Sequence, residues 1–267
     1  MNNQKPIIHI SEFTYTEIFD GMNIAVLPWG SCEPHGEYLS YCTDTLLAEK
    51  IAEDSIYKTD NPNMFRVLPS ISFGSQNIGQ YDKKFCIHFS IETQKGILRD
   101  IVASLNKQSV NKLVIINGHN GNNFKSIVRD LEFEFPDFRI YVCNYLDLVT
   151  HEWIIKNVNN LAPLIDDHAG FTETSLMLYY FNLLFNPKHY VNIAELGEYQ
   201  FDKNETDIYN KVKSNSALWT PRDWDDYSFK TRIGSAKRAS TNYGKIIAEY
   251  ICEQIAKDLN KIVKLEL

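Results

Sequence analysis

The sequence predicts an α/β fold: a single domain built as a three-layer α/β/α sandwich around a central, mostly parallel sheet. Short apolar runs alternate along the chain with longer segments whose apolar residues recur at helical spacing. This alternation is typical of parallel sheets with helices on both faces. The clearest run, 113–116, has four apolar residues in succession, and such a strand needs cover on both faces, as parallel strands do. A chain of 267 residues is long enough to bury that core.

Local patterns predict the elements of the first half. The apolar run 24–27 precedes a polar loop with proline and glycine, which indicates a buried strand. A helix is expected to start at Asp44, because an aspartate at the N-cap accepts hydrogen bonds from free backbone N–H groups. Residues 65–73 are β-like but contain a proline, which indicates an edge strand or an irregular one. The apolar stripe over 97–105 predicts a helix.

The second half continues the alternation. After the strand at 113–116, the patterns predict a helix over about 123–133, a strand over 138–142 and a helix over about 172–183. The chain closes with an amphipathic helix over 243–262.

Residues 195–232 interrupt this rhythm, because they are charged and polar with little periodicity. We interpret them as an insertion. One interpretation is a solvent-exposed loop. The other is a lid or an oligomer contact that uses its aromatic residues, among them Trp219 and Trp224. Since the chain has no internal repeat and no linker, residues 1–267 are expected to form one domain.

The composition excludes several classes of protein. With 27 Lys+Arg against 34 Asp+Glu and a formal net charge of −7, the chain is not expected to bind nucleic acid or an anionic membrane. The most apolar stretch, 175–185, is too short to cross a bilayer. Five cysteines without C-x-x-C spacing support neither a disulfide framework nor a zinc ribbon. Because the N-terminus also lacks the pattern of a secretion signal, a soluble, cytoplasmic protein with reduced thiols is expected.

The loop after the strand at 24–27 is a first candidate site, since it carries Glu33 and His35 and leads to Asp44. Residues two apart in an extended loop point the same way, so Glu33 and His35 can face one point on which Asp44 closes. Glu, His and Asp together suit Zn²⁺, Mn²⁺ or Fe²⁺. Taken singly, Asp44 is equally explained as a helix cap and His35 as an ordinary histidine.

A second loop follows the strand at 113–116 and places His119 between Gly118 and the pair Asn120 and Gly121. Gly and Asn allow left-handed backbone, so the turn can present the histidine together with several N–H groups. Such a loop supplies a metal-ligating histidine beside donors for a substrate oxyanion, or an anion cradle at a helix N-terminus. A plain strand-to-helix turn would explain the glycines but not the histidine between them.

The third segment has His168 just ahead of Glu173, which falls in the first turn of a predicted helix. The helix dipole favours a carboxylate at that position whether or not it binds a ligand. A histidine near a metal site can titrate close to neutrality and shuttle a proton.

In their order and spacing, the three segments resemble the creatininase (creatinine amidohydrolase) family. The matching residues are 27–36, Leu39 and Asp44, then 117–122, then 168–170 with 173–175, and more weakly 234–244. The resemblance implies an α/β fold with a central parallel sheet, frequently assembled as a homohexamer, with one or two divalent metals at the strand ends. The family's known reactions are largely hydrolyses of C–N bonds in cyclic or small amides.

The resemblance also assigns roles. The metal ligands that it implies are Glu33, His35, Asp44, His119 and Glu173. Asp44 falls on the position that commonly bridges two metals. His168 matches a histidine proposed to assist proton transfer, so His168 and Glu173 are the expected catalytic residues. The turn residues expected to bind the substrate oxyanion are Gly118, Asn120 and Gly121.

The sequence departs from creatininase itself at two positions of the central loop. Gly121 stands where that enzyme has a glutamate ligand, so either Glu173 completes a second metal site or the site holds one ion. Asn120 replaces the aromatic residue that follows the central histidine, which argues against creatinine as the substrate. The expected substrate is another small cyclic or linear amide.

The function that these residues favour is a metal-dependent amidohydrolase, in which a metal-activated hydroxide cleaves a C–N bond. A competing mechanism would use Cys32 or Ser31 beside His35 as the nucleophile, although the G-x-S-x-G elbow is absent. A noncatalytic, oligomeric metal-binding protein of the same fold is the other alternative. Loss of a ligand or of the proton shuttle would mark it, and the five implied ligands and His168 are all present.

Overall fold

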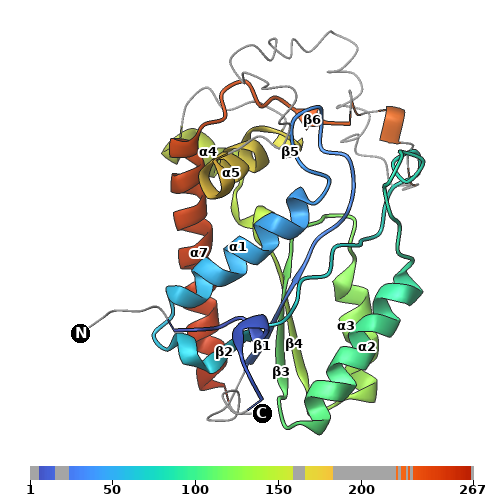
Figure 1. Ribbon diagram of the computed structural model, residues 1–267, viewed down its shortest axis with the longest axis vertical. Coiled ribbons are helices and arrows are strands. Elements are labelled where there is room, and N and C mark those ends of the chain that lie inside the picture. The colour runs from blue at the N-terminus through green and yellow to red at the C-terminus, as the bar shows by residue number, and fades with distance from the viewer. Residues whose placement is uncertain are drawn as a thin grey trace.

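Figure 1 shows the computed structural model of the protein. It describes residues 6–15, 24–158, 166–182, 221, 224–226, 228 and 231–265. Four parallel strands form the central sheet in the order β2-β1-β3-β4. They are β1 (Ile24–Trp29), β2 (Phe65–Val67), β3 (Lys112–Asn117) and β4 (Arg139–Asn144). The predicted parallel sheet is therefore confirmed.

Helices lie on both sides of this sheet (Figure 1). On one side are α1 (Thr43–Tyr57), α4 (His151–Asn157), α5 (Phe171–Phe181) and α7 (Thr241–Lys264), and on the other are α2 (Ile91–Lys107) and α3 (Phe124–Glu134). Val26 belongs to the apolar core with α1 and α7, whereas Ala25 and Leu27 belong to the core with α2 and α3. Successive strand residues point to opposite faces, so one continuous apolar run serves both cores.

Short 3-10 helices connect several elements. They are η1 (Ile10–Glu12), η2 (Pro62–Met64), η3 (Tyr145–Leu148) and η5 (Trp224–Asp226). Among the described helices, none combines the length and the apolar composition needed to cross a membrane.

The segment 65–73 is an irregular edge strand, as predicted. β2 ends at Val67 on the edge of the sheet, because Pro69 has no N–H group with which to continue the pairing. The chain then returns to β1 for one bridge, in which the Ile71 N–H donates to the Pro28 carbonyl at 3.0 Å.

The prediction that Asp44 caps its helix is wrong. α1 begins at Thr43 with Cys42 as its N-cap, and Asp44 lies inside the first turn. The Thr43 N–H and hydroxyl groups both donate to the Ser40 carbonyl, so the turn that starts the helix closes before the aspartate. The Asp44 carboxylate is thereby left to contact other side chains.

A second, smaller sheet was not evident from the sequence. β5 (Asp166–His168) pairs antiparallel with β6 (Ile233–Gly234), and next to it the Gly36 N–H donates to the Thr231 carbonyl at 2.9 Å. The pair therefore joins His168 to the loop that carries Glu33 and His35. Of the expected insertion 195–232, only 221, 224–226, 228 and 231–232 are described, and the rest of that prediction lies outside the described residues.

Candidate metal centre

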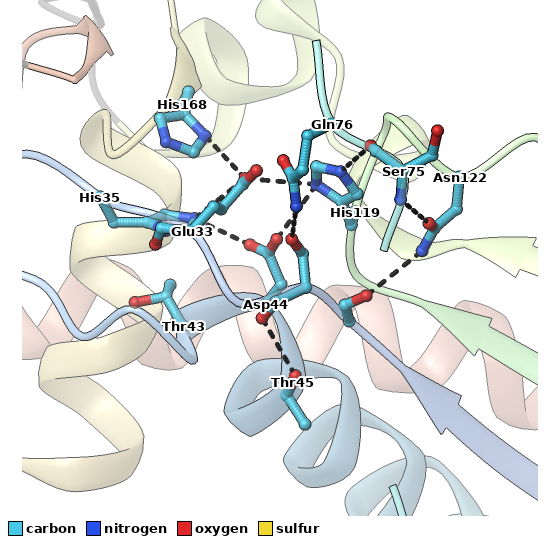
Figure 2. Close-up of polar contacts among 12 residues, drawn as sticks. Glu33, His35, Thr43, Asp44, Thr45, Ser75, Gln76, His119, Asn122 and His168 are labelled. Atoms are coloured by element: carbon cyan, nitrogen blue, oxygen red, sulfur yellow. Dashed lines mark hydrogen bonds and ion pairs between the residues drawn. The ribbon is translucent and has the colours of Figure 1, made fainter. Parts of the chain in front are cut away.

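Buried acidic and histidine side chains meet at the carboxyl ends of β1 and β3 (Figure 2). They come from the loop after β1, the first turn of α1, the loop after β3, the end of β5 and the first turn of α5. The residues are Glu33, His35, Asp44, His119, His168 and Glu173, of which Figure 2 labels all but the last. These residues are almost inaccessible to solvent, with exposed fractions between 0% and 7%. The residues after β1 and β3 converge because parallel strands end at the same edge of a sheet, whereas His168 and Glu173 come from β5, which pairs with β6 in the smaller sheet, and from the helix that follows it.

The first group joins the two early carboxylates to the central histidine. His119 Nδ1 lies 3.2 Å from Glu33 Oε1 and 3.2 Å from Asp44 Oδ2. The ligand atoms of these three residues all lie within 4.8 Å of one another. One cation can therefore contact all three residues.

The second group uses the other oxygen of the same aspartate. His35 Nε2 lies 2.8 Å from Asp44 Oδ1 and 4.0 Å from Glu173 Oε2, and the ligand atoms of these three residues also lie within 4.8 Å of one another. Glu173 Oε2 is held in place by the Ala169 N–H, which donates to it at 2.6 Å. Asp44 is thus shared between these two groups, one carboxylate oxygen facing each, while Glu33, His35 and His168 form a third group of the same kind.

All three histidines are oriented by backbone carbonyl oxygens. His35 Nδ1 lies 3.0 Å from the Glu33 carbonyl, His119 Nε2 lies 2.8 Å from the Ser75 carbonyl, and His168 Nε2 lies 2.9 Å from the Pro34 carbonyl. A carbonyl oxygen only accepts, so each of these nitrogens carries the proton. In the neutral ring, the opposite nitrogen then turns a lone pair toward the carboxylates. Metal-ligating histidines in proteins are held in this way.

Two carboxylate oxygens of the site lack a hydrogen-bond partner. Glu33 Oε1 and Asp44 Oδ2 are buried without a hydrogen-bond partner, and the described residues that line the adjoining cavity include neither lysine nor arginine. Buried carboxylates are strongly unfavourable unless they are paired or coordinate a metal. A divalent cation fits this donor set of carboxylate oxygens and imidazole nitrogens.

The mutual charges of the site shift the pKa values of its ligand side chains. Burial alone would lower the pKa of His35, but the carboxylates of Asp44, Glu173 and Glu33 outweigh it and raise that pKa to about 10. The pKa of His119 is raised in the same way, against the effect of burial, by Glu33 and Asp44. Without a metal, the histidines therefore hold protons that balance the acids.

The pKa values of Glu173 and His168 shift in the directions that burial dictates. Burial raises the pKa of Glu173 to about 8, with His35 opposing the shift and Asp44 adding to it. Burial, reinforced by the charge of His35, lowers the pKa of His168 to about 4. His168 is thus a neutral imidazole at pH 7, with Nδ1 lying 3.6 Å from Glu33 Oε1.

The glycines of the central loop allow two close approaches. A Cβ on Gly118 would lie 2.3 Å from the Asp44 carbonyl oxygen, and a Cβ on Gly121 would lie 2.2 Å from the Ser75 carbonyl oxygen. The Gly118 N–H donates to the Trp29 carbonyl at 2.9 Å. The N–H group of Gly118 therefore belongs to the β1–β3 pairing. Gly118, Asn120 and Gly121 all line the cavity.

The neighbours of His35 are not arranged as nucleophiles. Ser31 Oγ is buried and accepts a hydrogen bond from the Gln76 side chain. Burial, with a contribution from Cys42, raises the pKa of the Cys32 thiol to about 11, which disfavours the reactive thiolate. Both nitrogens of His35 contact other groups, so the nucleophilic alternative loses its base.

A cavity of about 170 Å³ opens onto these side chains. Its wall also includes residues that the sequence did not identify as site residues, namely Asn77, Gln80, Leu146, Asp167 and Trp224. The Trp224 ring stands edge-on to the His168 ring with 5.0 Å between centroids. The aromatic content of 195–232 had suggested a lid, but no sequence pattern distinguishes Gln80. A second cavity of about 280 Å³ shares Glu173 and Asn120 with the first.

Comparisons with known proteins support a single family. A family model described as creatininase, creatinine amidohydrolase, matches residues 10–259. A creatinine amidohydrolase from Pseudomonas putida is 27% identical over 188 residues, which cover 64% of this chain and 71% of that protein. The crystal structure of a candidate creatinine amidohydrolase from Bacteroides fragilis is 33% identical, covers 97% of this chain and 98% of its own, and has a TM-score of 0.82. A manganese creatininase structure, 22% identical, shares the fold with a TM-score of 0.71 over 95% of this chain and 98% of its own.

Proposed function

The chain belongs to the creatininase family, and from this premise we propose that it is a metal-dependent amidohydrolase. It cleaves a C–N bond in a small cyclic or linear amide. One observation carries the proposal: the two oxygens of the buried Asp44 face two different ligand groups. A carboxylate that faces two ligand groups could serve a pair of divalent ions, which act together in two-metal hydrolytic sites.

The proposed metal site uses residues that the structure brings together. The first group would hold one ion through Glu33, Asp44 and His119, and the second would hold another through His35, Asp44 and Glu173. Zn²⁺, Mn²⁺ and Fe²⁺ all accept imidazole and carboxylate ligands. When bound, an ion of this kind makes water a nucleophile near neutral pH and polarises a carbonyl oxygen.

His168 is the proposed proton carrier. Its ring is neutral at pH 7 because burial lowers its pKa to about 4, and its Nε2–H group is fixed on the Pro34 carbonyl. Nδ1 is left to accept a proton from the attacking water and to pass it to the departing nitrogen. Glu173 faces the same cavity and is the second proposed catalytic residue.

Substrate binding is proposed for the turn after β3. Asn120 and Gly121 line the cavity beside His119, where N–H groups can stabilise charge on a carbonyl oxygen. Leu146 and Trp224 provide apolar walls. At about 170 Å³ the cavity fits a small amide.

Turnover assays test this proposal directly. Small lactams, formamides and ureido compounds would be screened with the protein loaded with Mn²⁺, Zn²⁺ or Fe²⁺. Hydrolysis should stop on chelation while circular dichroism shows the fold retained, because an open catalytic site is not required for folding. Metal binding without turnover of any compound would instead favour the noncatalytic metal-binding protein. We also propose that the protein is a cytoplasmic homohexamer. Light scattering would test the oligomeric state, and cell fractionation would test the location.

A further inference from the structure

Gln80 contacts the proposed metal ligand Glu33 at a different carboxylate oxygen from the one that the histidines face. Its side chain is only 1% exposed, and its Nε2 group donates a hydrogen bond to Glu33 Oε2. The other end of the amide, Oε1, accepts from the Asn77 N–H at 3.3 Å. The orientation of the amide is therefore fixed, since exchanging its nitrogen and oxygen would break both contacts.

This hydrogen bond distinguishes the two oxygens of Glu33. Oε2 is engaged by Gln80, whereas Oε1 has no hydrogen-bond partner and lies 3.2 Å from His119 Nδ1. We propose that Gln80 is a positioning residue, which holds Glu33 so that Oε1 alone is presented to a divalent cation. The inference rests on the proposed function.

The chemistry of an amide suits this task. Gln80 donates a hydrogen bond but carries no charge, so Glu33 keeps its full negative charge for the cation. A lysine or arginine at this position would neutralise that charge. Glutamine therefore orients the carboxylate without weakening it as a ligand.

The backbone around Gln80 is held by hydrogen bonds within its own loop and by a contact with the turn at Trp224. Within its own loop, the Gln80 N–H donates to the Asn77 carbonyl and the Lys83 N–H donates to the Gln80 carbonyl, each at 3.1 Å. From the far end of the chain, the Trp224 N–H donates to the Ile78 carbonyl at 2.7 Å. Lys83 Nζ also pairs with the Asp225 carboxylate, 2.6 Å from Oδ2. The loop that presents Gln80 is thus fixed on the same turn that places Trp224 beside His168.

Gln80→Met is the direct test, because methionine keeps the length of the side chain and removes the donor. Gln76→Met is a matched control from the same loop: Gln76 is also buried, but its amide donates to Ser31 Oγ instead of to a proposed ligand. Titration calorimetry with Mn²⁺ alone would measure affinity, and the visible spectrum of the Co²⁺-loaded protein would report the ligand geometry. Loss of an outer partner of a metal ligand costs about 10- to 100-fold in affinity.

We expect that loss in Gln80→Met, with a changed Co²⁺ spectrum, and an affinity within about twofold of the parent protein in Gln76→Met. Unchanged affinity and spectrum in Gln80→Met, or equal losses in both variants, would overturn the inference and leave the proposed function intact. If Gln80→Met does not fold, Gln80→Asn replaces it, because its amide is one methylene too short to keep the contact; unchanged Mn²⁺ affinity in that variant overturns the inference. A parent protein that binds no divalent ion would refute the proposed function itself.

Discussion

Asp44→Asn should weaken cation binding in both ligand groups at once. Asparagine has nearly the same shape, so the substitution removes the charge and one acceptor oxygen while preserving the packing. Asp44 Oδ1 lies 2.8 Å from His35 Nε2, and Oδ2 lies 3.2 Å from His119 Nδ1. Each of the two groups therefore loses part of its negative charge.

The expected magnitude follows from the burial of the aspartate. Asp44 is only 2% exposed, so solvent cannot replace the missing charge. Removing one partner of a buried charge pair costs about 3–5 kcal/mol. At 1.4 kcal/mol per tenfold change, the affinity for a divalent ion should fall by about two to four powers of ten.

Titration calorimetry with Mn²⁺ and metal analysis of the dialysed protein would measure this effect. Glu173→Gln provides the contrast, because Glu173 belongs only to the group with His35. Its loss should weaken the binding of one ion and leave the binding of the other unchanged. Asp60→Asn, a charge change at an exposed position, should change neither. If Asp44→Asn affects one ion only, or binds as tightly as the parent protein, the shared-carboxylate reasoning is refuted.

Three further predictions follow from the same geometry. His168→Asn should lower kcat by about 10²- to 10⁴-fold, the usual contribution of a general acid–base group, and should leave the metal content unchanged. Loss of metal from this variant would instead identify His168 as a ligand. Because the carboxylates hold the pKa of His35 at about 10 and raise that of His119, cation binding at pH 7 should release protons and weaken as the pH falls. Calorimetry in buffers of different ionisation enthalpy would detect this release, and an enthalpy independent of buffer would contradict it. Gly118→Ala places a methyl group 2.3 Å from the Asp44 carbonyl and should destabilise the fold by about 1–3 kcal/mol, whereas an unchanged Tm would show that α1 can move away.

Sequence patterns alone determined the parallel sheet, because they reflect local geometry. The apolar run 113–116 predicts β3, and period-two alternation places its residues in both cores. The candidate ligands were also evident, since Glu33 and His119 follow strands of the sheet and Glu173 falls in the first turn of a helix. Residues at the ends of parallel strands meet there whatever their distance along the chain.

The tertiary structure decided how these residues face one another. Which nitrogen of His119 is free depends on the Ser75 carbonyl, 44 positions away along the chain, and the orientation of Glu33 depends on Gln80, 47 positions away. Asp44 looked like a helix cap because a first-turn aspartate has the same local pattern as an N-cap. Periodicity encodes which face of an element is apolar, but a hydrogen bond between two loops depends on the geometry of both, and no local pattern carries that information.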